Sequence, residues 1–201
     1  MFQTTAQKIT DRLCSQDIIE DADKELYAYG FNMLLTVSLN IISTIIIGLL
    51  FGMVFESIAF LVAYIPLRSY AGGYHARTPL RCYIISLLLI VLILLTLNLI
   101  GESVLALFIL SGIGTIICVT MSPVEDANKP LDGIEKQVYR KKAMIILAIE
   151  IIILIISIFA LMKLAAVIST SLALEGIMLV LGKIINTQFK STNSKTKEEN
   201  I

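Results

Sequence analysis

Long runs of uncharged, apolar residues alternate with short polar connections along this chain. Six runs are expected to form membrane-crossing helices, over residues 32–50, 51–67, 82–101, 103–124, 143–162 and 164–182. Five of them reach the length of about 20 residues that a helix needs to cross a bilayer. The pattern predicts an all-α integral membrane protein with one transmembrane domain at 31–185. An N-terminal segment at 1–30 precedes this domain, and a flexible polar tail at 186–201 follows it.

The second run is the exception in length. Only residues 57–67, between Glu56 and Arg68, are free of charge, and eleven helical residues rise about 16 Å. A helix that crosses must therefore begin near Phe51 and carry Glu56 towards the outer interface. The alternative is a re-entrant segment that returns to the side it came from.

Composition agrees with a membrane protein. Hydrophobic residues make up 57% of the 201 residues, charged residues 16%, and the mean hydropathy is +0.86. A soluble domain of this composition would expose too much apolar surface. The net charge is zero and no nucleic-acid or phosphate-binding motif is found, so neither nucleic acid nor a cofactor is expected. No cleavable signal peptide is expected either, because about thirty largely polar residues precede the first apolar run.

The distribution of Lys and Arg sets the expected orientation. With six crossings, fifteen of the sixteen basic residues fall on one side of the membrane and only Lys163 on the other. A re-entrant second segment would leave twelve against four. Because basic residues concentrate in cytoplasmic connections, we expect both termini and the loops near 68–81 and 123–142 to be cytoplasmic.

The first thirty residues predict a helix lying at the membrane interface. Its apolar face would be formed by Ile9, Leu13, Ile18 and Leu26. The acidic residues at 17–25 would not favour an anionic lipid surface. Two interpretations remain open, a solvated helix and an acidic face that docks a basic partner peptide.

The chemistry-bearing residues lie in the short basic connection before the third run. His75 is the only histidine of the chain, and Cys82 follows it by seven residues. A neutral imidazole within hydrogen-bond reach of a thiol can form the thiolate–imidazolium pair that cysteine peptidases use. The sequence therefore predicts a nucleophile and a base near a membrane surface.

Local signals favour a reactive Cys82. Thr78 can cap a helix and Pro79 suits the first helical position. Cys82 is then about the fourth helical residue, where the helix N-terminus and the nearby Arg77 and Arg81 would stabilise a thiolate.

Other interpretations of these residues compete with a dyad. Taken singly, His75 could be an interfacial polar residue and Cys82 a packing residue. A serine mechanism could use Ser69 or Ser86 with the same base, although nothing in the sequence poises either. One His and one Cys cannot complete a zinc site. The three cysteines, Cys14, Cys82 and Cys118, match no metal or disulfide spacing.

The residues around this pair carry a family resemblance. The segment Arg68…Gly72-Gly73-Tyr74-His75-Ala76…Cys82-Tyr83 resembles the core of the accessory gene regulator protein B (AgrB) family. Tyr29-Gly30, Ser122-Pro123…Lys129-Pro130-Leu131 and Arg140-Lys141-Lys142 are also similar to that family. Some members carry extra histidines before the catalytic one, where this chain has Tyr70 and Gly72.

The resemblance implies a membrane cysteine endopeptidase with a His75–Cys82 dyad. Its substrate would be a short, membrane-associated, AgrD-like propeptide, which is cleaved through an acyl-thioester on Cys82 and cyclised to a thiolactone or lactone for quorum sensing. It also implies the plasma membrane of a bacterium, contact with membrane lipids, a homodimer, and an active site at the cytoplasmic face.

Roles follow for residues near the dyad. Arg68, Gly73, Arg77 and Arg81 are predicted to bind the substrate or the developing oxyanion. Thr78 and Pro79 would support Cys82, and Glu175 would orient His75 or pair with an arginine.

Two functions of other classes remain as alternatives. An ionisable residue inside a span is costly and is a candidate for function. Glu150 and Glu175, with Gly112 and Gly114, could therefore line the path of a small transporter or channel subunit. Alternatively, each glutamate could pair with Lys142, Lys183 or a serine or threonine of a neighbouring helix. A membrane scaffold that uses the acidic N-terminal helix is the third possibility.

Overall fold

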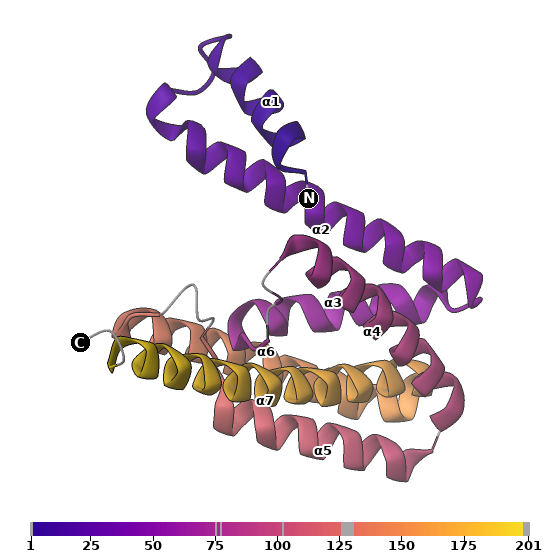
Figure 1. Ribbon diagram of the computed structural model, residues 1–201. Helices are drawn as coiled ribbons and strands as arrows, with labels where there is room; N and C mark the ends of the chain where they lie inside the picture. The colour runs from indigo at the N-terminus through magenta and orange to yellow at the C-terminus, as the bar shows by residue number, and fades with distance from the viewer. Residues whose placement is uncertain (1, 75, 77, 102, 126–130, 199–201) are drawn as a thin grey trace. The chain divides into compact units, whose positions relative to one another are not determined.

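The computed structural model is helical. It describes residues 2–74, 76, 78–101, 103–125 and 131–198, with the backbone alone at Pro79 and 188–198. Within these ranges the chain forms seven α-helices and no β-strand (Figure 1). The helices are α1 Gln3–Cys14, α2 Lys24–Leu50, α3 Val54–Ala71, α4 Pro79–Ile100, α5 Val104–Met121, α6 Gly133–Ala160 and α7 Met162–Glu198. All but α1 are long and apolar enough to cross a membrane, which confirms the expected six.

The chain divides into two compact units. The first comprises Met1–Gly52 and Ala76–Val91, and the second comprises Met53–His75 and Leu92–Ile201. The first unit therefore contains α1, α2 and the start of α4. The second contains α3, α5, α6, α7 and the rest of α4.

The N-terminal segment is not one helix, which corrects the expectation for residues 1–30. After α1, Asp17 adopts a left-handed backbone with φ 53°. The amide of Ile18 then donates to the carbonyl of Leu13 at 3.1 Å, and that of Asp17 to Cys14 at 3.0 Å. This bond pattern ends helices. A short 3-10 turn at Asp21–Asp23 follows, and α2 begins at once.

The turn folds α1 back beside the first part of α2 (Figure 1). An ion pair of 2.8 Å between Asp11 and Lys24 ties the two helices together. Lys24 therefore belongs to the helix of the first span. The predicted interfacial helix is confined to α1.

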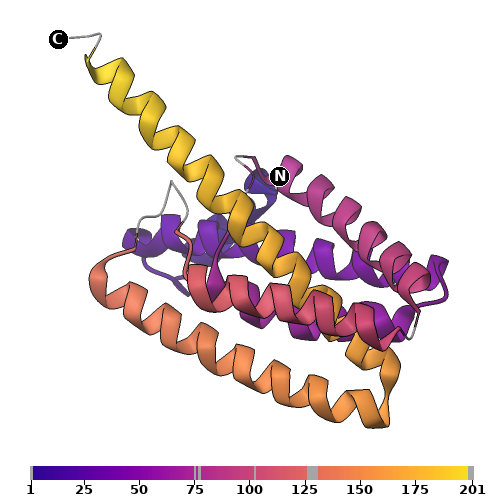
Figure 2. The same cartoon turned by 90° about the horizontal axis from the view of Figure 1, so that it is seen from below.

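Helix α7 is the core of the second unit. In the apolar stretch of α7, 72% of the residues are buried inside the protein. In the corresponding stretches of the other five spans, 28% or less are buried. It packs against α3, α5 and α6, and both views show it against α5 (Figures 1 and 2). The small residues of α7 allow this packing, because helices in membranes approach closely where side chains are small.

The crossing of α5 and α7 depends on two glycines. A Cβ on Gly176 would lie 3.3 Å from the Cα of Gly114, and one on Gly114 would lie 2.7 Å from the backbone nitrogen of Ala173. Gly114 is therefore a packing residue against α7. Gly112, by contrast, has no atom near the place of a Cβ among the described residues.

Helix α3 has the length for a full crossing. Its 18 residues rise about 27 Å, close to the ~30 Å of a hydrocarbon core. It begins at Val54, three residues later than expected, after Gly52 turns the chain with φ 67°. Glu56 in its first turn lies 3.7 Å from Lys163 at the start of α7. This ion pair offsets part of the free-energy cost of placing the Glu56 carboxylate near the end of a membrane-spanning helix.

The last helix extends beyond the expected end of its span. The sequence analysis ends that span at residue 182 and predicts a flexible tail at 186–201. The helix instead runs on to Glu198. The flexibility of the tail stays a prediction.

Helix α6 starts with a full capping box. The amide of Glu135 donates to the Asp132 carboxylate at 2.6 Å, and the amide of Asp132 donates to the Glu135 carboxylate at 3.2 Å. We expect Asp132→Ala to lower stability by about 1 kcal/mol, measured as thermal unfolding in lipid. Ser103 also precedes a helix but makes no side-chain cap bond, so Ser103→Ala is the control. Equal effects of the two variants would contradict the assigned cap.

Candidate active site

The predicted site residues fall into two groups. Thr78, Pro79, Arg81 and Cys82 belong to the first unit, whereas Arg68, Gly73 and Glu175 belong to the second. His75 and Arg77 lie outside the described residues, as do Lys129 and Pro130 of the family-like motif. The structure therefore shows what surrounds Cys82 in the first unit. Separately, it shows what surrounds residues 72–74, which precede His75, in the second unit.

Cys82 lies on the first turn of α4. The helix begins at Pro79, as the sequence predicts, and the amide of Cys82 donates to the carbonyl of Thr78 at 3.0 Å. The Thr78 hydroxyl accepts from the amide of Arg81 at 3.4 Å, which makes Thr78 the cap. Cys82 is a free, partly exposed cysteine.

The turn that carries Cys82 is tied to α2. The hydroxyls of Tyr83 and Ser43 lie 2.8 Å apart, within hydrogen-bond distance. A bond between two spans in an apolar medium has few competitors and helps to fix how the helices face each other. The sequence analysis missed this contact, because Ser43 is forty residues away and its span has no feature that marks it.

The chain that leads to His75 leaves α3 through two glycines with positive φ. Gly72 has φ 79° and Gly73 φ 114°, conformations that side chains rarely adopt. The amide of Gly73 donates to the carbonyl of Val124 at 3.2 Å, and the amide of Val124 to Ala71 at 2.9 Å. This short bridge joins the end of α3 to the connection that follows α5.

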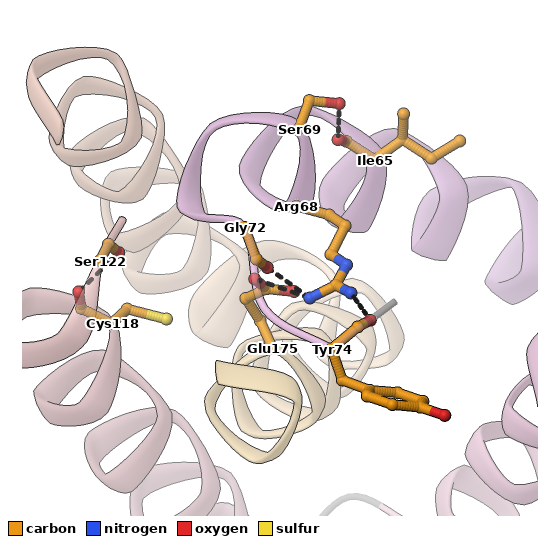
Figure 3. A network of polar contacts seen from close by, with 8 residues as sticks. All are labelled: Ile65, Arg68, Ser69, Gly72, Tyr74, Cys118, Ser122 and Glu175. Atoms are coloured by element: carbon orange, nitrogen blue, oxygen red, sulfur yellow. Dashed lines mark hydrogen bonds and ion pairs between the residues drawn. The ribbon is translucent and has the colours of Figure 1, made fainter. Parts of the chain in front are cut away.

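Arg68 holds the same chain from the side of α3. Its two terminal nitrogens donate to the carbonyls of Gly72 and Tyr74 (Figure 3). Nη1 also lies 3.7 Å from Oε1 of Glu175, an attraction between charges that is too long for a hydrogen bond. Glu175 is fully buried and the Arg68 side chain is 14% exposed. The guanidinium is therefore engaged by groups of the protein.

The connection after α5 is anchored at several points. Arg140 donates to the carbonyls of Ser122 at 2.6 Å and Val119 at 3.1 Å, where α5 ends. Lys142 lies over the ring of Tyr70, 4.9 Å from its centre. Two residues of the family-like basic cluster therefore stabilise the fold around the bridge.

Glu150 stands apart from these contacts. It is 5% exposed, and neither carboxylate oxygen has a hydrogen-bond partner within the described part of the chain. The buried, unpartnered carboxyl of Glu150 is the observation that supports the transporter alternative.

Cys118, on α5, is fully buried.

The serine alternatives have other partners. The Ser69 hydroxyl donates to the carbonyl of Ile65 at 2.7 Å, and that of Ser86 to the carbonyl of Cys82 at 3.0 Å. Both are bonds within one helix, as is common for serine in spans. Neither bond prepares the hydroxyl for attack.

The comparisons with known proteins cover most of the chain. The model of the family Accessory gene regulator B matches residues 6–179. An AgrB-like protein of Clostridium perfringens strain SM101 is 29% identical over 166 residues, which are 79% of this chain and 78% of that protein. AgrB-like protein 2 of strain 13 of the same species is 28% identical over the same shares. No solved structure matches significantly. With its helical spans and its Arg68-to-Tyr83 motif, the chain belongs to the accessory gene regulator B family.

Proposed function

We propose that this protein is a membrane cysteine endopeptidase that processes a short quorum-sensing propeptide, with Cys82 as nucleophile and His75 as base. Family membership supports a role in quorum sensing. The observation that carries the proposal is the position of Cys82, partly exposed on the first turn of α4 and capped by Thr78. Several contacts also fix the chain at Gly72–Tyr74, directly before the proposed base.

In the first step the thiol proton passes from Cys82 to His75, and the sulfur attacks a peptide carbonyl of the propeptide. The carbon–nitrogen bond breaks, and the imidazolium gives its proton to the departing amine. The products are a free C-terminal tail and an acyl-thioester on Cys82.

In the second step an internal cysteine or serine of the propeptide attacks the thioester. A new thioester or ester forms, the bond to Cys82 breaks, and the proton of the attacking group returns to the Cys82 sulfur. Exchange of one thioester for another is nearly balanced in bond energy, so the ring closes without ATP.

Charge and helix geometry supply the remaining parts. Arg77, Arg81 and the free amides at the start of α4 would bind the developing oxyanion or the acidic tail of the substrate. Gly73 and Arg68 act on the chain that enters His75. The site lies at the cytoplasmic face of a bacterial plasma membrane, in a protein that contacts lipids and forms a homodimer.

The proposal is tested by intact-mass analysis of the purified protein in lipid after mixing with candidate propeptides. We expect a mass gain equal to the propeptide minus its tail, and fragmentation should locate it on the peptide that contains Cys82. Well-folded protein that gives neither adduct nor cleavage with several propeptides, including that of its own genome neighbourhood, would overturn the assignment.

The second candidate, a small transporter or channel subunit, rests on the unpartnered carboxyl of Glu150. In that case Glu150→Gln should abolish function and Cys82→Ala should leave it intact. The endopeptidase predicts the opposite for Cys82.

A further inference from the structure

One face of α7 touches the backbone that leads into His75. The amide of Tyr74 donates to the carbonyl of Met178 at 2.9 Å. A carbonyl oxygen has two lone pairs, so one inside a helix can still accept from an outside amide. Tyr74 is the last described residue before His75, so this bond fixes the chain at the point just before the proposed base.

Gly182, one turn further along α7, makes the contact possible. A Cβ at this position would lie 2.6 Å from the carbonyl carbon of Gly73 and 2.6 Å from the amide nitrogen of Tyr74. Both neighbours are backbone atoms, which cannot rotate away as a side chain can. On the other side, a Cβ on Gly73 would lie 2.8 Å from the carbonyl oxygen of Met178. Two glycines therefore face each other across the contact.

Glu175 lies on the same face, because positions 175, 178 and 182 follow the spacing of one helix face. Its buried carboxylate attracts Arg68, whose guanidinium donates to the carbonyls of Gly72 and Tyr74 (Figure 3). The face thus holds residues 72–74 in two ways, by direct backbone contact and through the arginine.

We propose that the α7 face formed by Glu175, Met178 and Gly182 is a seat for residues 72–74, the chain that precedes His75, with Gly182 and Glu175 as positioning residues. The inference rests on the proposed dyad. Gly182 lies beyond residue 179, where the family match ends. Because a shift of about 1 Å in a reacting group can cost about 100-fold in rate, a seat of this kind controls turnover more than substrate affinity.

The test compares Gly182→Ala with Gly112→Ala, purified in lipid. Gly112 lies in a span of the same unit, with open space where its Cβ would be. For Gly182→Ala we expect the kcat of propeptide cleavage to fall about 100-fold with KM changed only a few-fold. Gly112→Ala should keep both constants.

A second readout separates a displaced base from a loosened fold. We expect Gly182→Ala to slow the alkylation of Cys82 by iodoacetamide at pH 7 to the rate of His75→Ala, because the thiol has lost its base. A loosened fold would expose the thiol and speed the reaction. Glu175→Gln, which keeps the shape of the side chain, should show the same slowing and serves if Gly182→Ala does not fold.

The seat is overturned if Gly182→Ala and Glu175→Gln both cleave within about threefold of Gly112→Ala. It is also overturned if their alkylation is as fast as in the unchanged protein, or faster. Full cleavage by Cys82→Ala or His75→Ala would instead overturn the proposed dyad, so the two failures are distinguishable.

Discussion

Cys82→Ala is expected to abolish both cleavage and the covalent adduct. The variant has no sulfur at this position to attack the peptide carbonyl. His75→Ala should lower the rate of cleavage by about 100-fold to 10,000-fold, because it removes the group that takes and returns the proton. Both rates are measured by mass spectrometry of the released tail, with membrane insertion verified for each variant.

The other two cysteines provide matched controls. Cys118 is fully buried on α5. Partial desolvation, followed by the charge of Asp21, holds the pKa of the Cys14 thiol above its ordinary value, which leaves little thiolate at neutral pH. Cys14→Ala and Cys118→Ala should therefore keep the adduct and most of the cleavage rate. A persistent adduct in Cys82→Ala, or its loss in Cys14→Ala, would contradict the choice of nucleophile.

Local patterns were enough to predict the spans and the start of α4. Length and hydropathy mark a crossing helix without knowledge of its neighbours, because the bilayer requires every backbone group to be bonded within the helix. Thr78 and Pro79 mark a helix start for an equally local reason, since a cap bonds only to the next turn. The error in the N-terminal segment arose from Asp17, whose left-handed turn has weaker sequence signals than a glycine would give.

The contacts around the candidate site could not be predicted in the same way. Val124 and Met178 bond to the chain before His75 through their backbone, which is identical in every residue and leaves no mark in the sequence. Gly182 does carry a signal, a glycine at the end of an apolar span, but helix ends commonly have glycine for other reasons. That Gly182 faces Gly73 can be seen only in the folded structure.

Arg68 illustrates how charge alone leaves a role undecided. The sequence predicts a residue that binds the substrate or the oxyanion. In the structure its two terminal nitrogens donate to the carbonyls of Gly72 and Tyr74, beside the buried Glu175. The two roles predict different effects of a lysine at this position. A positioning role requires the geometry of the guanidinium, whereas a binding role requires mainly its charge.

Arg68→Lys is therefore expected to lower kcat by about 100-fold while leaving KM nearly unchanged. Lysine keeps the positive charge but has one nitrogen in place of the planar fork, so it cannot serve both carbonyls and Glu175. Loss of a hydrogen bond from the guanidinium to one of these partly buried carbonyls would loosen the chain that precedes His75. A residue that only attracted the acidic tail of the substrate would tolerate lysine in kcat and show its loss in KM. Steady-state kinetics in lipid separates the two, with Arg12→Lys on helix α1 as the control. A lysine variant with full kcat would show that the charge of Arg68, and not its geometry, is what the site requires.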